Sequence, residues 1–341
     1  MRDNSISIAK AIAIMLMVLA HTQFSDYGNR LINMFHMPLF FFFSGYCMKD
    51  KYLNSTTDFF KKRIVGLYKP FVKWSVIFLI IHNLFFRLNI YNNEYGFKGH
   101  ASNLYTWQEL GFKFIKIITS MSGEEQLLGG YWFLKCLFIS SVIGFFIIKY
   151  NKRTIIGCIF LIFLTIVLQA FDLRVPYWAI GAKDTFAAIF FYIGHSYKKY
   201  NINLHEHFYI LPLGFIAVII GEIYWSGSLL SFKWYNVLPY TISAVLGILA
   251  VFYISKLILT SSSKLVEYIT YMGDNTITVL TWHFLCFKLV NLLIILLYKL
   301  PVQKLAEFPT ITEYSQKGWF VVYFFIGVLI PLLMSKNKYM K

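Results

Sequence analysis

The chain has 341 residues, of which 58% are hydrophobic and 14% are charged, and its formal net charge is +16. A soluble globular protein carries about 25% charged residues, so this composition excludes one packed core with an ordinary polar surface. The positive charge does not require a nucleic acid partner, because lysine and arginine beside membrane spans orient the chain and contact anionic headgroups. Four scattered cysteines without CxxC spacing predict neither a disulfide framework nor a metal site.

Ten apolar segments predict ten helices that cross a membrane. The alternation of a lipid-facing β-barrel is missing, so helices must satisfy the backbone hydrogen bonds inside the bilayer. In chain order, the segments are residues 5–22, 32–48, 68–90, 130–148, 154–171, 182–197, 208–225, 237–257, 275–298 and 318–335. We therefore expect an all-α, polytopic membrane helical bundle that forms a single domain over residues 1–341.

Basic residues are distributed unequally between the two sides of this bundle. Most of the 32 lysine and arginine residues fall on the side of the N-terminus, with a dense group between the second and third segments. This asymmetry predicts that both termini are cytoplasmic. The first segment is not expected to be a cleaved signal peptide, because Lys10 interrupts it and the next apolar segment follows at once.

The first segment contains two ionisable residues, Lys10 and His21. An ionisable side chain at membrane depth is costly and therefore marks a candidate functional site. Eleven positions along a helix place the two side chains within roughly 20° of each other and ~16 Å apart along the axis. That spacing suits a long anionic ligand that enters from the cytoplasm and presents its far end to His21. The same spacing fits equally well a structural role, in which Lys10 extends to the lipid headgroups and His21 lies at the outer interface.

The second segment begins near His36, which we expect at a depth similar to that of His21. Pro38 suits the first turn of a helix that starts there. The basic group that follows includes Lys62 and Arg63 in FFKKRIVGLYKP. These side chains either hold phosphates or anchor the cytoplasmic end of the third segment.

The outer segment around residues 91–129 has apolar positions at helical spacing with lysines between them. We expect it either to lie along the outer membrane surface or to cover a substrate cleft. Trp132 and Lys135 open the fourth segment, and His283 lies in the ninth, so these three residues are candidates for lining a substrate channel. His205 lies in a charged loop, where we expect it to be solvated.

Several motifs resemble the acyltransferase-3 family of integral membrane acyltransferases. RDNSISIAKAIAIMLMVLAH is similar to the family's opening, in which a basic residue precedes a histidine by eleven positions. FHMPLFFFFSGY and FFKKRIVGLYKP match its second and third elements. YWFLKCLF, FFYIGHSYKK and GDNTITVLTWH extend the likeness more weakly over most of the chain.

The resemblance implies a bundle of about ten helices in a bacterial cell membrane, with both termini inside. It also implies an acyltransferase that takes an acyl group from cytoplasmic acetyl-CoA, or another acyl-CoA, without a metal. The acceptor is then a hydroxyl of an extracytoplasmic polysaccharide or other glycan. The partners would be acyl-CoA, the glycan and the lipid bilayer; the sequence predicts no oligomeric state.

The resemblance also assigns residues. His21 matches the catalytic histidine, and Lys10 matches the basic residue of its motif, where many members have arginine. Lys62 and Arg63 match the segment associated with the CoA phosphates. The recurrent histidines are matched by His36, which we group with the catalytic candidates, and by His283. Many members also have aspartate where this chain has Ser7.

In the expected mechanism, His21 acts as general base on the attacking hydroxyl or assists a relayed acyl transfer. Direct transfer and a covalent relay both remain open at this point. Two other functions also remain open: a polysaccharide exporter or flippase without acyl transfer, and a structural partner of a glycan synthesis complex.

Overall fold

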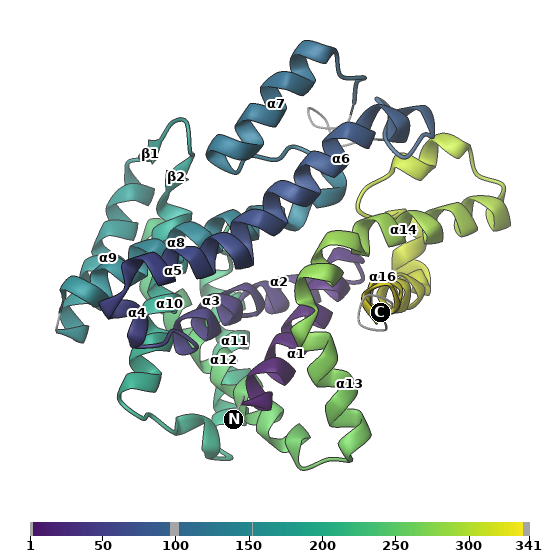
Figure 1. Ribbon diagram of the computed structural model, residues 1–341. Coiled ribbons are helices and arrows are strands. Elements are labelled where there is room, and N and C mark those ends of the chain that lie inside the picture. The colour runs from purple at the N-terminus through teal and green to yellow at the C-terminus, as the bar shows by residue number, and fades with distance from the viewer. Residues whose placement is uncertain (1–2, 96–101, 152, 337–341) are drawn as a thin grey trace. The chain divides into compact units, whose positions relative to one another are not determined.

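The computed structural model describes residues 3–95, 102–151 and 153–336 (Figure 1). The predicted cytoplasmic ends, residues 1–2 and 337–341, lie outside the described residues. In the described part, the chain is almost entirely helical, and its sheet is one antiparallel pair, β1 (Arg174–Val175) and β2 (Ile180–Gly181). The expected all-α character is therefore confirmed.

Sixteen α-helices make up most of the described chain. They are α1 Asn4–His21, α2 Asp26–Asn33, α3 His36–Tyr46, α4 Lys51–Asn54, α5 Thr56–Arg63, α6 Lys69–Arg87, α7 Trp107–Ser120, α8 Trp132–Tyr150, α9 Thr154–Ala170, α10 Ala182–Lys199, α11 Ile210–Trp225, α12 Val237–Leu259, α13 Ser263–Asp274, α14 Thr276–Tyr298, α15 Thr312–Tyr314 and α16 Phe320–Lys336. Short 3-10 and π segments join them: η1 Ile64–Tyr68, η2 Gln126–Tyr131, η3 Leu204–Glu206, η4 Trp234–Asn236, η5 Val302–Ala306 and η6 Ser315–Trp319.

Each of the ten predicted segments contains a helix. In the described residues, six helical stretches are long and apolar enough to cross a membrane: Asn4–His21, Thr56–Arg87, Gln126–Tyr150, Trp234–Leu259, Thr276–Tyr298 and Thr312–Ser335. Two more apolar helices, α9 and α11, are shorter. These helices indicate a multi-pass membrane protein; the number of ten crossings and the orientation stay predictions.

The predicted second segment, residues 32–48, is not one continuous helix. Helix α2 ends at Asn33, and α3 begins at His36 and has 11 residues. Pro38 lies in the first turn of α3, where a missing backbone N–H costs nothing. The sequence therefore identified the start of α3 but not the separate helix before it.

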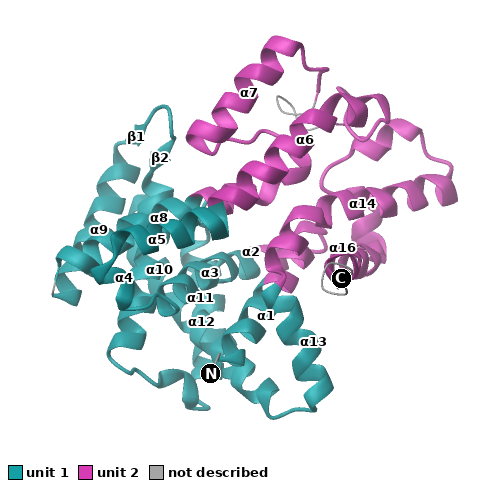
Figure 2. Ribbon diagram, in the orientation of Figure 1, with its two compact units in different colours: residues 1–13, 30–67, 136–274 teal, residues 14–29, 68–135, 275–341 magenta. Residues whose placement is uncertain are grey.

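The chain divides into two compact units, which Figure 2 distinguishes by colour. Unit 1 comprises residues 1–13, 30–67 and 136–274. Its helices α3 and α10 pack backbone to backbone, because a Cβ at Gly194 would lie 2.0 Å from the carbonyl oxygen of Phe42. Gly45 makes the same approach from α3, with the carbonyl oxygen of Phe191 1.8 Å from its ideal Cβ. This contact joins the C-terminal half of α3 to the C-terminal half of α10.

Helices α1 and α13 also approach closely within unit 1. An ideal Cβ at Gly273 would lie 1.7 Å from the carbonyl oxygen of Ser7. The Ser7 hydroxyl donates a hydrogen bond to Asp274 Oδ1 at 2.8 Å. The glycine of the GDN motif is therefore required for the contact with the first helix.

Unit 2 comprises residues 14–29, 68–135 and 275–341. Helix α14 packs against α16, and η2 packs against α14. Helix α7, from the outer segment, packs against α6 and is preceded by a capping box formed by Thr106 and Glu109. Its large apolar side chains Trp107 and Phe112 are exposed, whereas Ile117 is buried. The helical periodicity of this segment is thus confirmed, and its location at a membrane surface stays a prediction.

Candidate functional site

Two of the predicted site residues, His21 and His283, contact each other in unit 2. His21 Nδ1 lies 3.0 Å from His283 Nε2, and the two rings are stacked with centroids 5.1 Å apart. His21 is the last residue of α1, and His283 lies in α14. The sequence placed both at membrane depth but gave no sign that they meet.

Backbone carbonyls determine the tautomer of this pair. His283 Nδ1 lies 3.0 Å from the carbonyl oxygens of both Val279 and Leu280. Because carbonyl oxygens only accept, Nδ1 of His283 carries a hydrogen, and in the neutral ring Nε2 is the acceptor. His21 must then donate from Nδ1, which places the lone pair of neutral His21 on Nε2.

Aromatic side chains surround the two imidazoles. The ring of Phe284 stacks on His21 at 4.7 Å and lies 4.0 Å from His283. Phe308 packs on Phe284 at 4.6 Å, and Phe287 contacts His283 edge to face. The histidine pair therefore has an apolar wall that limits contact with water.

The segment after α14 is attached to the end of α1 that carries His21. The hydroxyls of Thr310 and Thr312 donate to Gln23 Oε1 at 3.0 and 2.7 Å. The hydroxyl of Ser315 donates to the carbonyl oxygen of Thr22. These bonds fix the two residues that follow His21.

Buried polar residues of α14 hold the same segment from the other side. Lys288 Nζ donates to the carbonyl oxygen of Glu307 at 2.8 Å, and Asn291 donates to the same oxygen at 3.2 Å. Asn291 in turn accepts from the Tyr323 hydroxyl at 2.5 Å. The lysine at membrane depth thus supports the chain next to Phe308.

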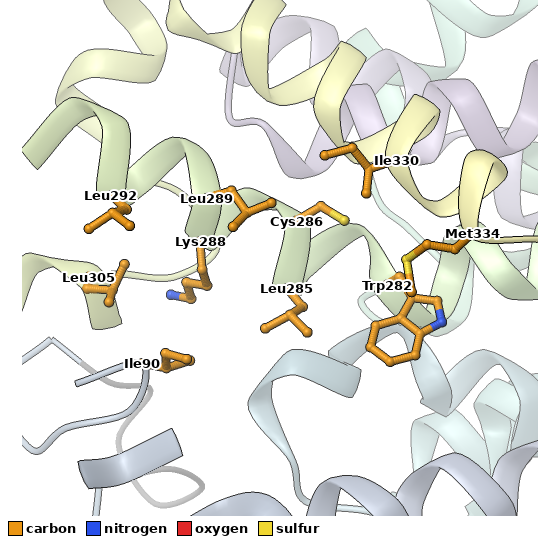
Figure 3. A pocket seen from close by; sticks show the side chains of 10 residues that line it. All are labelled: Ile90, Trp282, Leu285, Cys286, Lys288, Leu289, Leu292, Leu305, Ile330 and Met334. Atoms are coloured by element: carbon orange, nitrogen blue, oxygen red, sulfur yellow. The ribbon is translucent and has the colours of Figure 1, made fainter. Parts of the chain in front are cut away.

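A pocket of about 370 Å³ lies beside α14 and α16. Figure 3 shows the side chains that line it, among them Trp282, Leu285, Lys288 and Ile330. Neither His21 nor His283 lines it. Apart from Lys288, its lining is apolar. The pocket is therefore separate from the histidine pair, although Trp282 directly precedes His283.

The other predicted channel residues, Trp132 and Lys135, open α8. Lys135 is buried, with Nζ 3.4 Å from the Ser122 hydroxyl. A neighbour that the sequence reasoning missed, Tyr131, shares a 2.6 Å hydrogen bond with Thr281, two positions before His283. Its only sequence signal was its place in the YWFLKCLF motif. The segment that ends at Tyr131 thus packs beside the α14 turn that carries His283.

His36 belongs to unit 1, where it is buried at the break between α2 and α3. Its Nδ1 donates to the carbonyl oxygen of Ile32 at 2.7 Å. The Tyr240 hydroxyl donates to the next carbonyl oxygen, that of Asn33, at 2.9 Å. The Ile32 carbonyl oxygen also accepts from the backbone N–H of Phe35 at 3.3 Å, so His36 is its second donor, whereas Tyr240 is a side-chain donor to the carbonyl oxygen of Asn33. A catalytic role for His36 stays a prediction.

The predicted phosphate-binding residues of unit 1 differ in orientation. Arg63 donates from Nη1 to the Ser44 hydroxyl at 2.9 Å, and its guanidinium lies 5.1 Å from the Phe59 ring and 5.4 Å from the Phe191 ring. Lys62 is exposed. Arg63 thus packs toward α3 and α10, while Lys62 faces away from the core of the unit. Lys10 is half-buried on α1.

Two further histidines have partners that the sequence did not indicate. His82 Nδ1 lies 3.0 Å from Glu125 Oε2, and both side chains are buried. His82 Nε2 donates to the carbonyl oxygen of Asn103 at 2.9 Å. The expectation that His205 is solvated is wrong: its ring is buried, stacks on Phe252 at 3.9 Å and shares a 2.8 Å hydrogen bond with Tyr197.

Metal ligation was not expected, and the described residues contain no group of three or more His, Cys, Asp and Glu side chains placed to hold a metal. The chemistry that the described geometry supports is proton transfer by an oriented imidazole.

Comparison with known protein families identifies this chain's family. The family model described as "Acyltransferase domain" matches residues 3–336. No curated protein and no solved structure matches the chain. The family match includes residues of both units and contains every candidate residue described above.

Proposed function

We propose that the chain, which belongs to the acyltransferase-3 family, transfers an acyl group from cytoplasmic acyl-CoA to a glycan. Membership of this family makes the chain an acyltransferase, and the donor and acceptor are the proposal. The donor is acetyl-CoA in the simplest case. The acceptor is a hydroxyl of an extracytoplasmic polysaccharide or other glycan, and the protein resides in a bacterial cell membrane. The observation that carries this proposal is the contact between His21 and His283.

The pair supplies a base whose orientation is fixed. His283 is held by two backbone carbonyls, and it accepts from His21 Nδ1. His21 Nε2 therefore holds the lone pair and accepts the proton of the attacking hydroxyl. A base oriented by a second group that is itself held in place is the arrangement of general-base catalysis in acyl transfer.

The reaction balances without another reagent. The acceptor oxygen forms a bond to the acyl carbon as the carbon–sulfur bond of the thioester breaks. The hydroxyl proton moves to His21 Nε2 and then to the CoA sulfur. These steps describe direct transfer; a covalent relay would divide them into two transfers, the first from CoA to a nucleophile of the protein and the second from that nucleophile to the acceptor hydroxyl. The apolar wall of Phe284 and Phe308 favours transfer to the hydroxyl over hydrolysis of the thioester.

In this proposal, cations of unit 1 bind the acyl-CoA donor. Lys10 lies on the same helix as His21, eleven positions earlier, so it would interact with the donor about 16 Å along the axis from the base. A lysine there acts as a point charge and lacks the bidentate geometry of arginine. We assign Lys62 and Arg63 to the phosphates of CoA.

The test is the acyl content of surface glycan in cells that carry His21→Ala or the unchanged protein, measured by mass spectrometry at equal protein levels. Loss of acylation with unchanged glycan export is the expected result. Full acylation in the His21→Ala cells would overturn the proposal. A polysaccharide exporter would instead retain glycan inside the cell when the gene is deleted, whatever the acylation state of that glycan.

A further inference from the structure

The buried imidazole of His82 lies between two acceptors. Its Nε2 is 2.9 Å from the carbonyl oxygen of Asn103, and its Nδ1 is 3.0 Å from Glu125 Oε2. A carbonyl oxygen and an ionised carboxylate only accept hydrogen bonds, whereas a neutral imidazole carries a single N–H. With a neutral His82 and an ionised Glu125, one of the two contacts would therefore bring two acceptors together without a hydrogen between them.

One additional proton resolves this conflict. It makes His82 an imidazolium that donates from both nitrogens, or it makes Glu125 a carboxylic acid that donates to His82 Nδ1. The side chains of His82 and Glu125 are 0% and 3% exposed, so bulk water does not supply the missing donor. The pair therefore binds this proton as a unit, whichever residue carries it.

The two partners of His82 differ in how they are held. Glu125 directly precedes η2, whose last residue, Tyr131, is hydrogen-bonded to Thr281 of α14. Asn103 belongs to the segment that leads into α7, and it is exposed. Loss of the proton leaves His82 with one N–H. That N–H stays with Glu125, because a buried carboxylate without a donor costs more than a carbonyl group that can turn to water.

The other contacts of the segment before α7 do not depend on the protonation of this pair. The side-chain amide of Asn83 donates to the carbonyl oxygen of Tyr105 at 2.9 Å and accepts from the backbone N–H of Tyr105 at 2.8 Å. The Tyr105 ring also stacks on His82, with centroids 3.5 Å apart. The bond from His82 to Asn103 is therefore the attachment that a change in protonation removes.

The described ionisable side chains around the pair keep one charge state near neutral pH. Burial raises the pKa of the Tyr91 and Tyr105 phenols, so both stay neutral up to pH 9. Hydrogen bonds within the α7 capping box lower the pKa of Glu109, so it stays ionised. Lys113 and Glu124 form an ion pair with each other. A protonation change between pH 6 and 9 in this region therefore belongs to the pair itself.

We propose that His82 and Glu125 form a proton-binding site that fastens the segment before α7 to α6, and that loss of the proton at higher pH loosens this segment. The folded chain holds the proton at pH values where a free histidine is neutral and a free glutamate is ionised. Because the folded chain then binds more protons than the unfolded chain, the attachment weakens as the pH rises above about 6.5. This site works independently of the proposed acyl transfer.

The competing explanation is a fixed structural contact, in which a neutral His82 bonds to only one of its two neighbours. Glu125→Gln separates the two explanations. The glutamine amide donates to His82 Nδ1 and leaves the Nε2–H for Asn103, so both bonds persist at every pH without an additional proton. A fixed contact would give the wild-type protein and this variant the same response to pH.

Hydrogen exchange of the backbone amides in residues 102–107 measures the attachment in the purified full chain. Comparison of the wild-type protein with Glu125→Gln at the same pH cancels the intrinsic effect of pH on exchange. The two proteins should exchange equally at pH 6. At pH 9 the wild-type protein should exchange about fivefold faster than the variant, which corresponds to the loss of one hydrogen bond of ordinary net strength.

Two references accompany this measurement. The amides of residues 118–120 lie at the other end of α7, where the Tyr68 hydroxyl donates to the carbonyl oxygen of Ile118, and they should exchange equally in both proteins at both pH values. Glu313→Gln is the matched control variant, because it removes one carboxylate from the exposed pair with Lys317. It should respond to pH as the wild-type protein does.

Infrared difference spectra between pH 6 and 9 detect the proton itself. The wild-type spectrum should contain one carboxylic acid or imidazolium band that the Glu125→Gln spectrum lacks. Identical spectra, or equal exchange of residues 102–107 in the two proteins at both pH values, would overturn the inference. If Glu125→Gln does not fold, the wild-type protein decides alone: after correction for intrinsic rates, exchange of residues 102–107 relative to residues 118–120 must rise from pH 6 to 9, and a constant ratio would exclude the proton-binding site.

Discussion

His21 Nδ1 and His283 Nε2 lie 3.0 Å apart although 262 positions separate the two residues in the chain. His283 is held on its other side by the backbone of its own helix. One imidazole therefore orients the other, and the orientation determines which nitrogen of His21 is basic. We therefore propose that His283 positions His21.

Replacement of His283 should lower kcat without changing the KM for acyl-CoA. His283→Ala removes the acceptor that orients His21, and we expect a loss of about 10²-fold in kcat. His283→Gln should retain more activity, because a side-chain carbonyl can accept from His21 Nδ1. Transfer kinetics in reconstituted liposomes measure the effect. Equal activity of the alanine variant and the wild-type protein would contradict the positioning role.

Gly194→Ala should destabilise the contact of α3 with α10. The added methyl group would lie 2.0 Å from a carbonyl oxygen, so the helices must separate, at a cost of about 1–3 kcal/mol or more. Thermal unfolding in detergent measures the change. Gly111→Ala in α7 is the matched control, because its methyl group meets nothing within 4 Å, and it should leave stability unchanged or raised. Equal melting temperatures for both variants would contradict the close contact.

His205 should make stability depend on pH. Burial lowers its pKa below the ordinary value, and the charge of Lys256 adds to that effect. Between the lowered value and about 6.5 the unfolded chain binds more protons, so stability falls as the pH decreases below about 6.5. Melting temperatures between pH 5 and 8 should show this slope.

His205→Gln should flatten the slope in pH, while the exposed His207→Gln should leave it unchanged. A slope that is equal in all three proteins would show that another group is responsible.

The buried side chains of His82 and Glu125 should contribute cooperatively to the free energy of unfolding. Either single alanine variant leaves its partner buried without the hydrogen bond between the two side chains, and we expect a loss of about 1–3 kcal/mol. The double variant should be less destabilised than the sum, which a double-mutant cycle measures. Glu313→Ala, in the exposed pair with Lys317, should leave the melting temperature nearly unchanged. Additive single effects would exclude the coupling.

His36 should be a structural residue. His36→Ala removes one of the two donors to the carbonyl oxygen of Ile32, so we expect a loss of about 0.5–1.5 kcal/mol. Tyr240→Phe removes the neighbouring donor and should act similarly. Unfolding measurements on both variants test this. A stable His36→Ala protein that has lost acyl transfer would instead support the predicted catalytic role.

The sequence allowed the helices to be predicted better than their contacts. Apolar length identified each of the ten helical segments, and Pro38 marked the start of α3. The break before His36 was missed, because its backbone is satisfied by Tyr240 of a distant helix. The burial of His205 was missed for the same reason, since Phe252 provides it.

The candidate site was predicted in part. His21 and His283 were selected separately, because ionisable residues at membrane depth are costly, but their contact depends on how α1 packs against α14. Charge alone could not distinguish the inward Arg63 from the exposed Lys62 beside it. That difference comes from Ser44 and Phe191, which lie on other helices.

The break between α2 and α3 has a consequence for the lipid that surrounds the protein. An 11-residue helix rises about 16 Å, roughly half of the ~30 Å hydrocarbon core, so α3 alone cannot cross a bilayer. Because His36 and Tyr240 donate to its carbonyl groups, we predict that the joint lets two short helices share the second of the predicted crossings. We predict that hydrophobic mismatch is accommodated at this joint, so that acyl transfer depends on the chain length of the surrounding lipids.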